Sequence, residues 1–168
     1  MAAALSWSHG PWAAQPALGA SAVVTQGEHV RVRHETLRLA NGFEVILVED
    51  HRLPLVAFNL WVHAGPRNEA KGQTGFAHLF EHLMFAGSKH IPRGEADKII
   101  DAAGGTDSNG TTNFDRTNYF QTVPKNALDT VLWLESDRMG HFRNAITQPI
   151  LDEQRGVVQN EKRQGDNQ

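Results

Sequence analysis

The segment His78-Leu79-Phe80-Glu81-His82 places two imidazoles and a carboxylate in a pattern that can bind a metal ion. Residues four apart on a helix share a face with their Cβ atoms about 6 Å apart, so both histidines can reach one ion. Zinc accepts imidazole nitrogen at about 2.0–2.1 Å. The order HxxEH is the inverse of HExxH, and in both orders the Glu can flank a metal held by two His. The segment therefore predicts a zinc site.

The rest of the helix expected over residues 75–86 is almost entirely apolar, which predicts that it is buried nearly all round. A carboxylate such as Glu81 is costly on such a helix unless its charge is compensated, and a divalent cation with a bound water would compensate it. The alternative is a surface patch in which the two histidines and Glu81 make ordinary hydrogen bonds. The apolar setting favours the metal.

A third ligand must come from His, Asp or Glu, because the chain has no cysteine and catalytic zinc usually takes three protein ligands. In the helix expected over residues 149–164, Gln154 and Glu161 lie near the middle of an apolar stripe formed by Ile150, Leu151, Val157 and Val158. In the helix expected over residues 125–139, Glu135 lies on a similar stripe. The pattern leaves both glutamates open: Glu161 has fewer charged neighbours, and Glu135 could form a structural ion pair with Arg138.

The elements that must position these residues are four expected strands and four expected helices. Alternating apolar residues on either side of Asn41-Gly42 predict a hairpin. Strands are expected over residues 30–39, 43–48, 55–62 and 117–123, and helices over residues 75–86, 94–103, 125–139 and 149–164. Hairpins grouped with helices predict an α+β domain, in which helices pack on one face of a largely antiparallel sheet.

The two ends of the chain differ from its middle. Residues 1–27 contain no Asp, Glu, Lys or Arg, and we interpret them as a leader. It is either a signal remnant, with Ala20-Ser21-Ala22 resembling a cleavage site, or a disordered segment. The signal reading favours a periplasmic or secreted protein over a cytoplasmic one. Residues 28–168 are expected to form the domain, and the polar stretch 161–168 without a closing strand suggests a piece of a longer protein.

Composition excludes some classes of protein. The 168 residues suffice for one compact domain with a core of its own. With 16 Lys+Arg against 19 Asp+Glu, the net charge of -3 excludes a nucleic-acid binder driven by electrostatics. No stretch reaches the roughly 18 apolar residues that span a bilayer, so no membrane span is expected.

Taken together, the motifs resemble the N-terminal domain of the pitrilysin/insulinase-type zinc peptidases, peptidase family M16. The resemblance covers about residue 37 to the C-terminus. It rests on HxxEH, on the Gly-rich run that follows, and on the segment Gln-Arg-Gly-Val-Val-Gln-Asn-Glu that ends at Glu161. Because the family's ligand Glu lies some 75–80 residues beyond HxxEH, the resemblance implies that His78, His82 and Glu161 bind one Zn²⁺. It also implies that Glu81 is the general base.

The resemblance assigns supporting roles as well. The family often has a second Glu seven residues before the ligand Glu. Here that position is Gln154, which can orient a neighbour by hydrogen bonds but adds no charge. In the family, a segment matching residues 104–112 forms an edge strand whose Asn-Ala pair contacts the substrate backbone, which implies this role for Asn109 and Gly110. The alternative is an Asn-Gly turn between a helix and a strand.

The implied function is that of a zinc-dependent metalloendopeptidase, which hydrolyses peptide bonds in a peptide or unfolded polypeptide with a water activated at the metal and Glu81 as the base. Family members close two related domains over the peptide, so a second M16-like domain, in the same chain or a partner subunit, would complete the site. This chain alone is therefore expected to bind zinc poorly or not to cleave peptides at all, since a site needs its whole supporting shell. One alternative is a non-catalytic subunit that serves as a scaffold, although such members typically lose HxxEH. The other is a structural zinc module, in which Glu81 would have no task.

Overall fold

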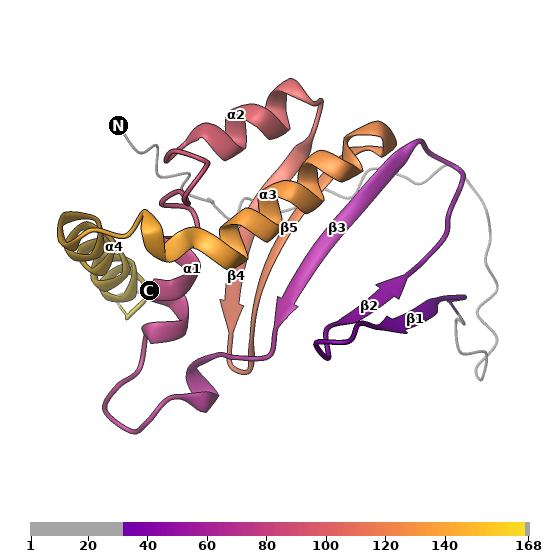
Figure 1. The fold of residues 1–168 in the computed structure, drawn as a ribbon. Helices are drawn as coiled ribbons and strands as arrows, with labels where there is room; N and C mark the ends of the chain where they lie inside the picture. Colours follow the sequence, from indigo (N-terminus) through magenta and orange to yellow (C-terminus); the bar gives the residue numbers. More distant parts are fainter. Residues whose placement is uncertain (1–31, 167–168) are drawn as a thin grey trace, which may run out of the picture. The chain divides into compact units, whose positions relative to one another are not determined.

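The computed structural model describes residues 32–166, so the leader predicted for residues 1–27 lies outside the described residues. The chain divides between Glu49 and Asp50 into two compact units. The elements in chain order (Figure 1) are β1 (Glu35–Arg38), β2 (Glu44–Leu47), β3 (Leu55–Val62), a 3-10 turn (Pro66–Asn68), α1 (Phe76–Leu83), α2 (Glu95–Ala102), β4 (Thr106–Asn113), β5 (Arg116–Pro124), a 3-10 turn (Lys125–Ala127), α3 (Leu128–His141), a 3-10 turn (Phe142–Asn144) and α4 (Gln148–Asp166). Across this described stretch, no helix combines the length and the apolar character needed to cross a bilayer.

The first unit contains the predicted hairpin. Strands β1 and β2 pair antiparallel, with Arg38 opposite Glu44. The amide of Gly42 donates to the carbonyl of Leu39 over 2.9 Å, and Gly42 has a φ of +87°, a left-handed conformation that glycine adopts without strain. The turn therefore ends at Gly42, the left-handed glycine itself, and such a turn is a common hairpin connection.

In the second unit, β3, β5 and β4 form an antiparallel sheet in that order, with β5 in the middle. The register sets Tyr119 of β5 between Leu60 of β3 and Gly110 of β4. The pairing of β4 shifts between Thr106 and Asn109. Such a bulge bends a strand locally and re-aims its side chains. The site side chains of β4 follow directly after this bend.

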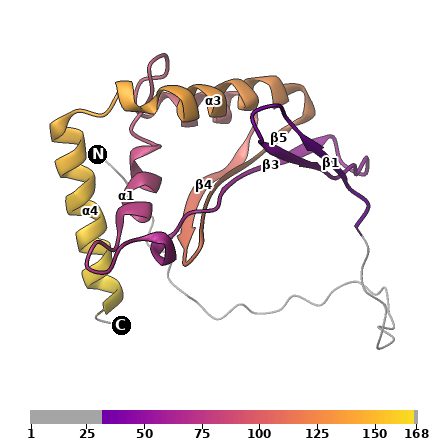
Figure 2. The same ribbon diagram turned by 60° about the horizontal axis from the view of Figure 1, so that its bottom comes forward.

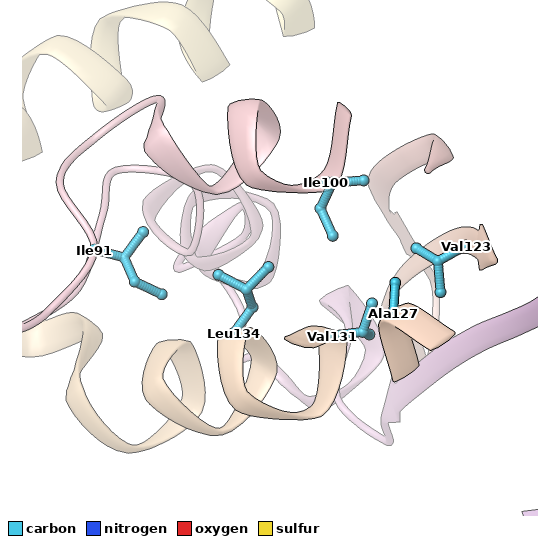
Figure 3. Close-up of a cluster of buried hydrophobic side chains, with 6 residues drawn as sticks. All are labelled: Ile91, Ile100, Val123, Ala127, Val131 and Leu134. Atoms are coloured by element: carbon cyan, nitrogen blue, oxygen red, sulfur yellow. The ribbon is translucent and has the colours of Figure 1, made fainter. Parts of the chain in front are cut away.

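Helices α2 and α3 pack on one face of this sheet, which confirms the predicted α+β class. Val56 and Phe58 of β3 pack against the buried cluster on this face, whereas Leu55 and Trp61 on the opposite face are 46% and 51% exposed. The cluster (Figure 3) comprises Ile91, Ile100, Val123, Ala127, Val131 and Leu134. Full burial of one aliphatic side chain stabilises the fold by about 1.5–3 kcal/mol, so this cluster secures both helices to the sheet.

A second buried cluster attaches the C-terminal end of α1 to the sheet. Leu60, Met84 and Tyr119 are buried together, and Phe85 packs against them. Hydrogen bonds from the amides of Phe85 and Ala86 reach back only three residues, so the helix expected to end at Ala86 finishes in a tightened last turn. Helix α4 lies beside α1 (Figure 2).

The expectation that this helix is buried nearly all round is wrong. Phe76 and Phe80 are 53% and 50% exposed, because the sheet, α4 and the two 3-10 turns that contact α1 (Pro66–Asn68 and Phe142–Asn144) cover only part of it. The stripe on α4 is likewise only partly covered. Gln154 is buried as its place on the stripe predicts, but the side chain of Glu161 remains 45% exposed.

The loop between α1 and α2 is held against α3 by a buried carboxylate. Asp137 accepts hydrogen bonds from the hydroxyl of Ser88 and from Nδ1 of His90, the latter over 2.5 Å. Burial by itself raises the pKa of Asp137, but these hydrogen bonds outweigh it, so its pKa lies below the ordinary value. The carboxylate therefore stays ionised, and it fixes the part of the loop that precedes Arg93.

Candidate metal centre

The two histidines of α1 bring their Nε2 atoms close together. His78 and His82 are one helical turn apart, and their rings meet edge to face with centroids 4.8 Å apart. Their Nε2 atoms are 3.2 Å apart. A helix alone brings the two side chains to one face, and the ring orientation then aims both nitrogens at a common point.

Glu161 of α4 brings a carboxylate oxygen to the same point. Its Oε2 lies 3.3 Å from Nε2 of His78 and 3.4 Å from Nε2 of His82. Zinc bonds of about 2.0–2.1 Å in a tetrahedron require ligand atoms about 3.3–3.4 Å apart. The three separations match this requirement, and nitrogen and carboxylate oxygen are both ordinary zinc ligands. The residues therefore fit the metal that the sequence predicts, and they are the only such group within residues 32–166.

The far side of the His82 ring is held by Gln154. Nδ1 of His82 lies 3.3 Å from Oε1 of Gln154, which can only accept a hydrogen bond. We therefore assign the proton of His82 to Nδ1, which leaves the lone pair of Nε2 free to bind a metal. A partner of this kind fixes both the tautomer and the orientation of a metal-binding imidazole.

Glu81 lies beside the histidines and is oriented by the sheet. Its Oε2 accepts a hydrogen bond of 2.5 Å from the hydroxyl of Thr112 on β4. Glu81 and His82 both line a cavity of about 250 Å³, whose wall also includes Asn109. Burial raises the pKa of Tyr119 above its ordinary value, and the charge of Glu81 raises it further, so this neighbouring phenol stays neutral.

Thr112 is a site residue that the sequence analysis missed. It lies in the polar segment after Gly104-Gly105, where an Asn-Gly turn was the alternative to an edge strand. The structure has a strand there, with Asn109 and Gly110 inside β4 and no turn between them. Because Thr112 follows Gly110 by two residues, both face α1, and this period of two was the only signal in the sequence that could have placed Thr112 beside Glu81.

Asn109 and Gly110 occupy different surroundings on β4. Asn109 borders the cavity, and its Oδ1 accepts a hydrogen bond of 2.8 Å from the amide of Gly110. Gly110 lies tight against α1: a Cβ placed on it would come within 3.0 Å of Phe85, 3.2 Å of Glu81 and 3.2 Å of Tyr119. The absence of a side chain at Gly110 therefore lets β4 approach Glu81 closely.

We expect Gly110→Val to lower the free energy of unfolding by about 1–3 kcal/mol, because added methyl groups in a packed contact force neighbours to move. It should also displace Glu81, which is among the contacted neighbours, while His78, His82 and Glu161 keep their places on α1 and α4. Thermal unfolding of the purified protein measures the effect on stability. Gly140→Val is the matched control, because no atom lies within 4 Å of a Cβ at that position; equal effects of the two substitutions would contradict the tight contact.

Glu135, the alternative third ligand, lies elsewhere and has other partners. It is buried, accepts a hydrogen bond of 2.9 Å from Gln121, and forms an ion pair with Arg138. Arg138 in turn lies over the rings of Phe85 and Tyr119, at 5.0 and 5.2 Å from their centroids. Glu135 is absent from the group of donor atoms that surrounds the two histidines. Glu135 therefore forms the structural ion pair with Arg138 that the sequence analysis gave as its alternative role.

Comparison with known proteins places the chain in a family. Residues 44–167 match the model of the insulinase family, peptidase family M16, and the chain belongs to this family. The family resemblance inferred from the sequence is thereby confirmed.

Relatives show how much of such a protein the chain represents. Zinc protease PqqE of Helicobacter pylori is 35% identical over 136 residues, which are 80% of this chain and 30% of that protein. The crystal structure of a protease from Helicobacter pylori aligns with a TM-score of 0.73 at 34% identity, covering 79% of this chain and 31% of that one. The periplasmic protease PqqL from Escherichia coli aligns with a TM-score of 0.68 at 28% identity, covering 77% and 15%. The chain thus spans less than a third of the length of these relatives.

Proposed function

We propose that this chain carries the metal ligands and the general base of a zinc-dependent metalloendopeptidase. The observation that supports it most strongly is the set of three donor atoms, from His78, His82 and Glu161, which lie 3.2–3.4 Å from one another. Zinc is the metal of choice because a relative in the same family is named a zinc protease and because the donors suit it.

His78, His82 and Glu161 would hold one Zn²⁺, with Gln154 orienting His82. Bound there, zinc supplies Lewis acidity that makes a water easier to deprotonate and a peptide carbonyl easier to attack. Three protein ligands would leave room at the ion for the reactants, as catalytic zinc sites usually do.

Glu81 acts as the general base in this proposal. Its Oε2 is occupied by the hydrogen bond from Thr112, which sets the direction of the carboxylate. The other oxygen, Oε1, then takes a proton from the attacking water and returns it to the leaving amine. Glu81 suits this task because it lines the same cavity as His82 and because its carboxylate is oriented before the substrate arrives.

The substrate is proposed to be an extended peptide or unfolded polypeptide segment lying along β4. Among the described residues β4 pairs only with β5, so its other edge can receive a further strand through main-chain hydrogen bonds. Asn109, on the cavity wall, would contact the substrate backbone, and Gly110 keeps the strand close to Glu81. Because the relatives extend well beyond the matched part, a second M16-like domain is proposed to complete the site. A periplasmic or secreted location is proposed by analogy with the periplasmic PqqL.

The test is hydrolysis of an unfolded polypeptide by the full-length protein that carries this chain. We expect cleavage that a chelator abolishes and added zinc restores, because the ion is required for the chemistry. Cleavage that persists after complete removal of the metal would contradict the proposal. Zinc bound in full without any cleavage would favour the alternative of a non-catalytic subunit.

A further inference from the structure

Gln154 is the only buried residue on the described part of α4, and its amide lies between two partners. Its Oε1 is 3.3 Å from Nδ1 of His82, and its Nε2 donates to Oε1 of Glu153 over 3.5 Å. The amide nitrogen and oxygen therefore face opposite partners, and the neighbouring Glu153 is the group that takes the NH₂ side.

The carboxylate of Glu153 is in turn fixed by Arg93, which comes from the loop between α1 and α2. Two parallel hydrogen bonds join them, at 2.8 and 2.9 Å. A bidentate pair of this kind fixes the direction of the carboxylate as well as its position. Arg93 and Gln154 also line the same cavity as His82. The four side chains thus form a continuous chain of hydrogen bonds that ends on a histidine of the proposed metal site.

The direction of the Gln154 amide decides which nitrogen of His82 carries the proton. A turned amide would present its NH₂ group to Nδ1, and Nδ1 would then have to accept a hydrogen bond. The proton would move to Nε2, the atom that faces Glu161 and His78, and Nε2 could no longer bind a cation. A carboxylate can only accept hydrogen bonds, so Glu153 favours the NH₂ group on its own side and the oxygen toward His82.

We infer that Arg93 and Glu153 are positioning residues for the metal centre, acting through the amide of Gln154 to hold His82 in the tautomer that binds zinc. This inference rests on the proposed function, because it assumes that His82 is a ligand. This chain of hydrogen bonds from Arg93 through Glu153 and Gln154 to His82, here called the relay, matters only while residue 154 is an amide. A Glu at position 154 would accept the hydrogen bond from Nδ1 with either oxygen, and its orientation would need no help from Glu153.

The test is the zinc dissociation constant of the full-length protein with Glu153→Ala, measured with residue 154 as Gln and again in the Gln154→Glu background. Loss of a partner that orients a ligand typically weakens metal binding 10–100-fold, and we expect about tenfold for Glu153→Ala with Gln154 present. In the Gln154→Glu background the same substitution should change the constant by less than about twofold, because no amide remains to be oriented. Asp152→Ala is the matched control: Asp152 is the adjacent acid, its side chain pairs with Arg155 and accepts a hydrogen bond from Gln148, and its loss should leave zinc binding unchanged.

Two outcomes would overturn the relay. One is an unchanged dissociation constant for Glu153→Ala. The other is an equal loss in both backgrounds, which would make the pair a plain anchor for α4. A wild-type protein that binds no zinc would instead overturn the metal site itself, so the two failures are distinguishable. The Arg93–Glu153 pair is itself partly exposed, so it should add little to stability, and melting temperature should not follow the change in affinity.

Discussion

Glu81→Gln is expected to bind zinc as the wild-type protein does and to lose peptide hydrolysis by at least about 100-fold, the contribution of a positioned general base. The amide keeps the size and the hydrogen bond from Thr112 but cannot take a proton from water. The effect should therefore fall on turnover, with little change in KM, because the substrate contacts proposed for β4 are untouched.

Steady-state kinetics with metal analysis on the same preparation measure this. Glu95→Gln supplies the matched control: it makes the same substitution on α2, where Glu95 pairs with exposed Lys98. Near-normal turnover in the Glu81 variant would remove Glu81 from the role of base, whereas loss of zinc would show that its carboxylate supports the ion instead.

Glu161→Ala is expected to weaken zinc binding by more than about 100-fold, beyond the 10–100-fold that even an orienting partner contributes. Removing the carboxylate leaves two imidazoles from a single helix and opens the site on the side of α4. Hydrolysis should fall in parallel, because the ion is lost.

The decisive comparison is with Glu135→Gln, which tests the other glutamate that the sequence left open. We expect this variant to retain zinc and to unfold at a lower temperature, because Glu135 is buried in an ion pair with Arg138. The opposite pattern, with zinc lost from the Glu135 variant and kept in the Glu161 variant, would contradict the assignment of the third ligand.

The approach of His78 to His82 on α1 could be predicted from the sequence because helix geometry alone brings residues four apart to one face. The choice between Glu161 and Glu135 could not, since both lie on apolar stripes of long helices. That choice depends on which helix packs beside α1, a contact between segments about 80 residues apart that no local pattern encodes. The family resemblance, with its ligand Glu some 75–80 residues beyond HxxEH, favoured Glu161 over Glu135.

Strand β4 could not be predicted from its own pattern of apolar and polar residues. Its residues are polar or small on both faces, so they lack the alternation of apolar and polar side chains that marks a half-buried strand. Pairing with β5 and packing of Gly110 against α1 make it a strand. The near-complete burial predicted for α1 was wrong for a related reason: the number of apolar residues on a helix does not say how many neighbours cover it, and Phe76 and Phe80 stay half exposed.

The pair Arg93 and Glu153 lies beyond any sequence signal. The residues are 60 apart in the chain, and each reads as ordinary surface charge. Only the tertiary structure shows that Arg93 reaches Glu153, and that the amide of the adjacent Gln154 faces His82.

The central claim is that His78, His82 and Glu161 share one ion, and anomalous diffraction at the zinc edge from zinc-loaded crystals of the full-length protein tests it most directly. A single peak about 2.0–2.1 Å from Nε2 of both histidines and from a carboxylate oxygen of Glu161 is the predicted result. A peak on the histidines without Glu161, or one on other residues altogether, would contradict the claim.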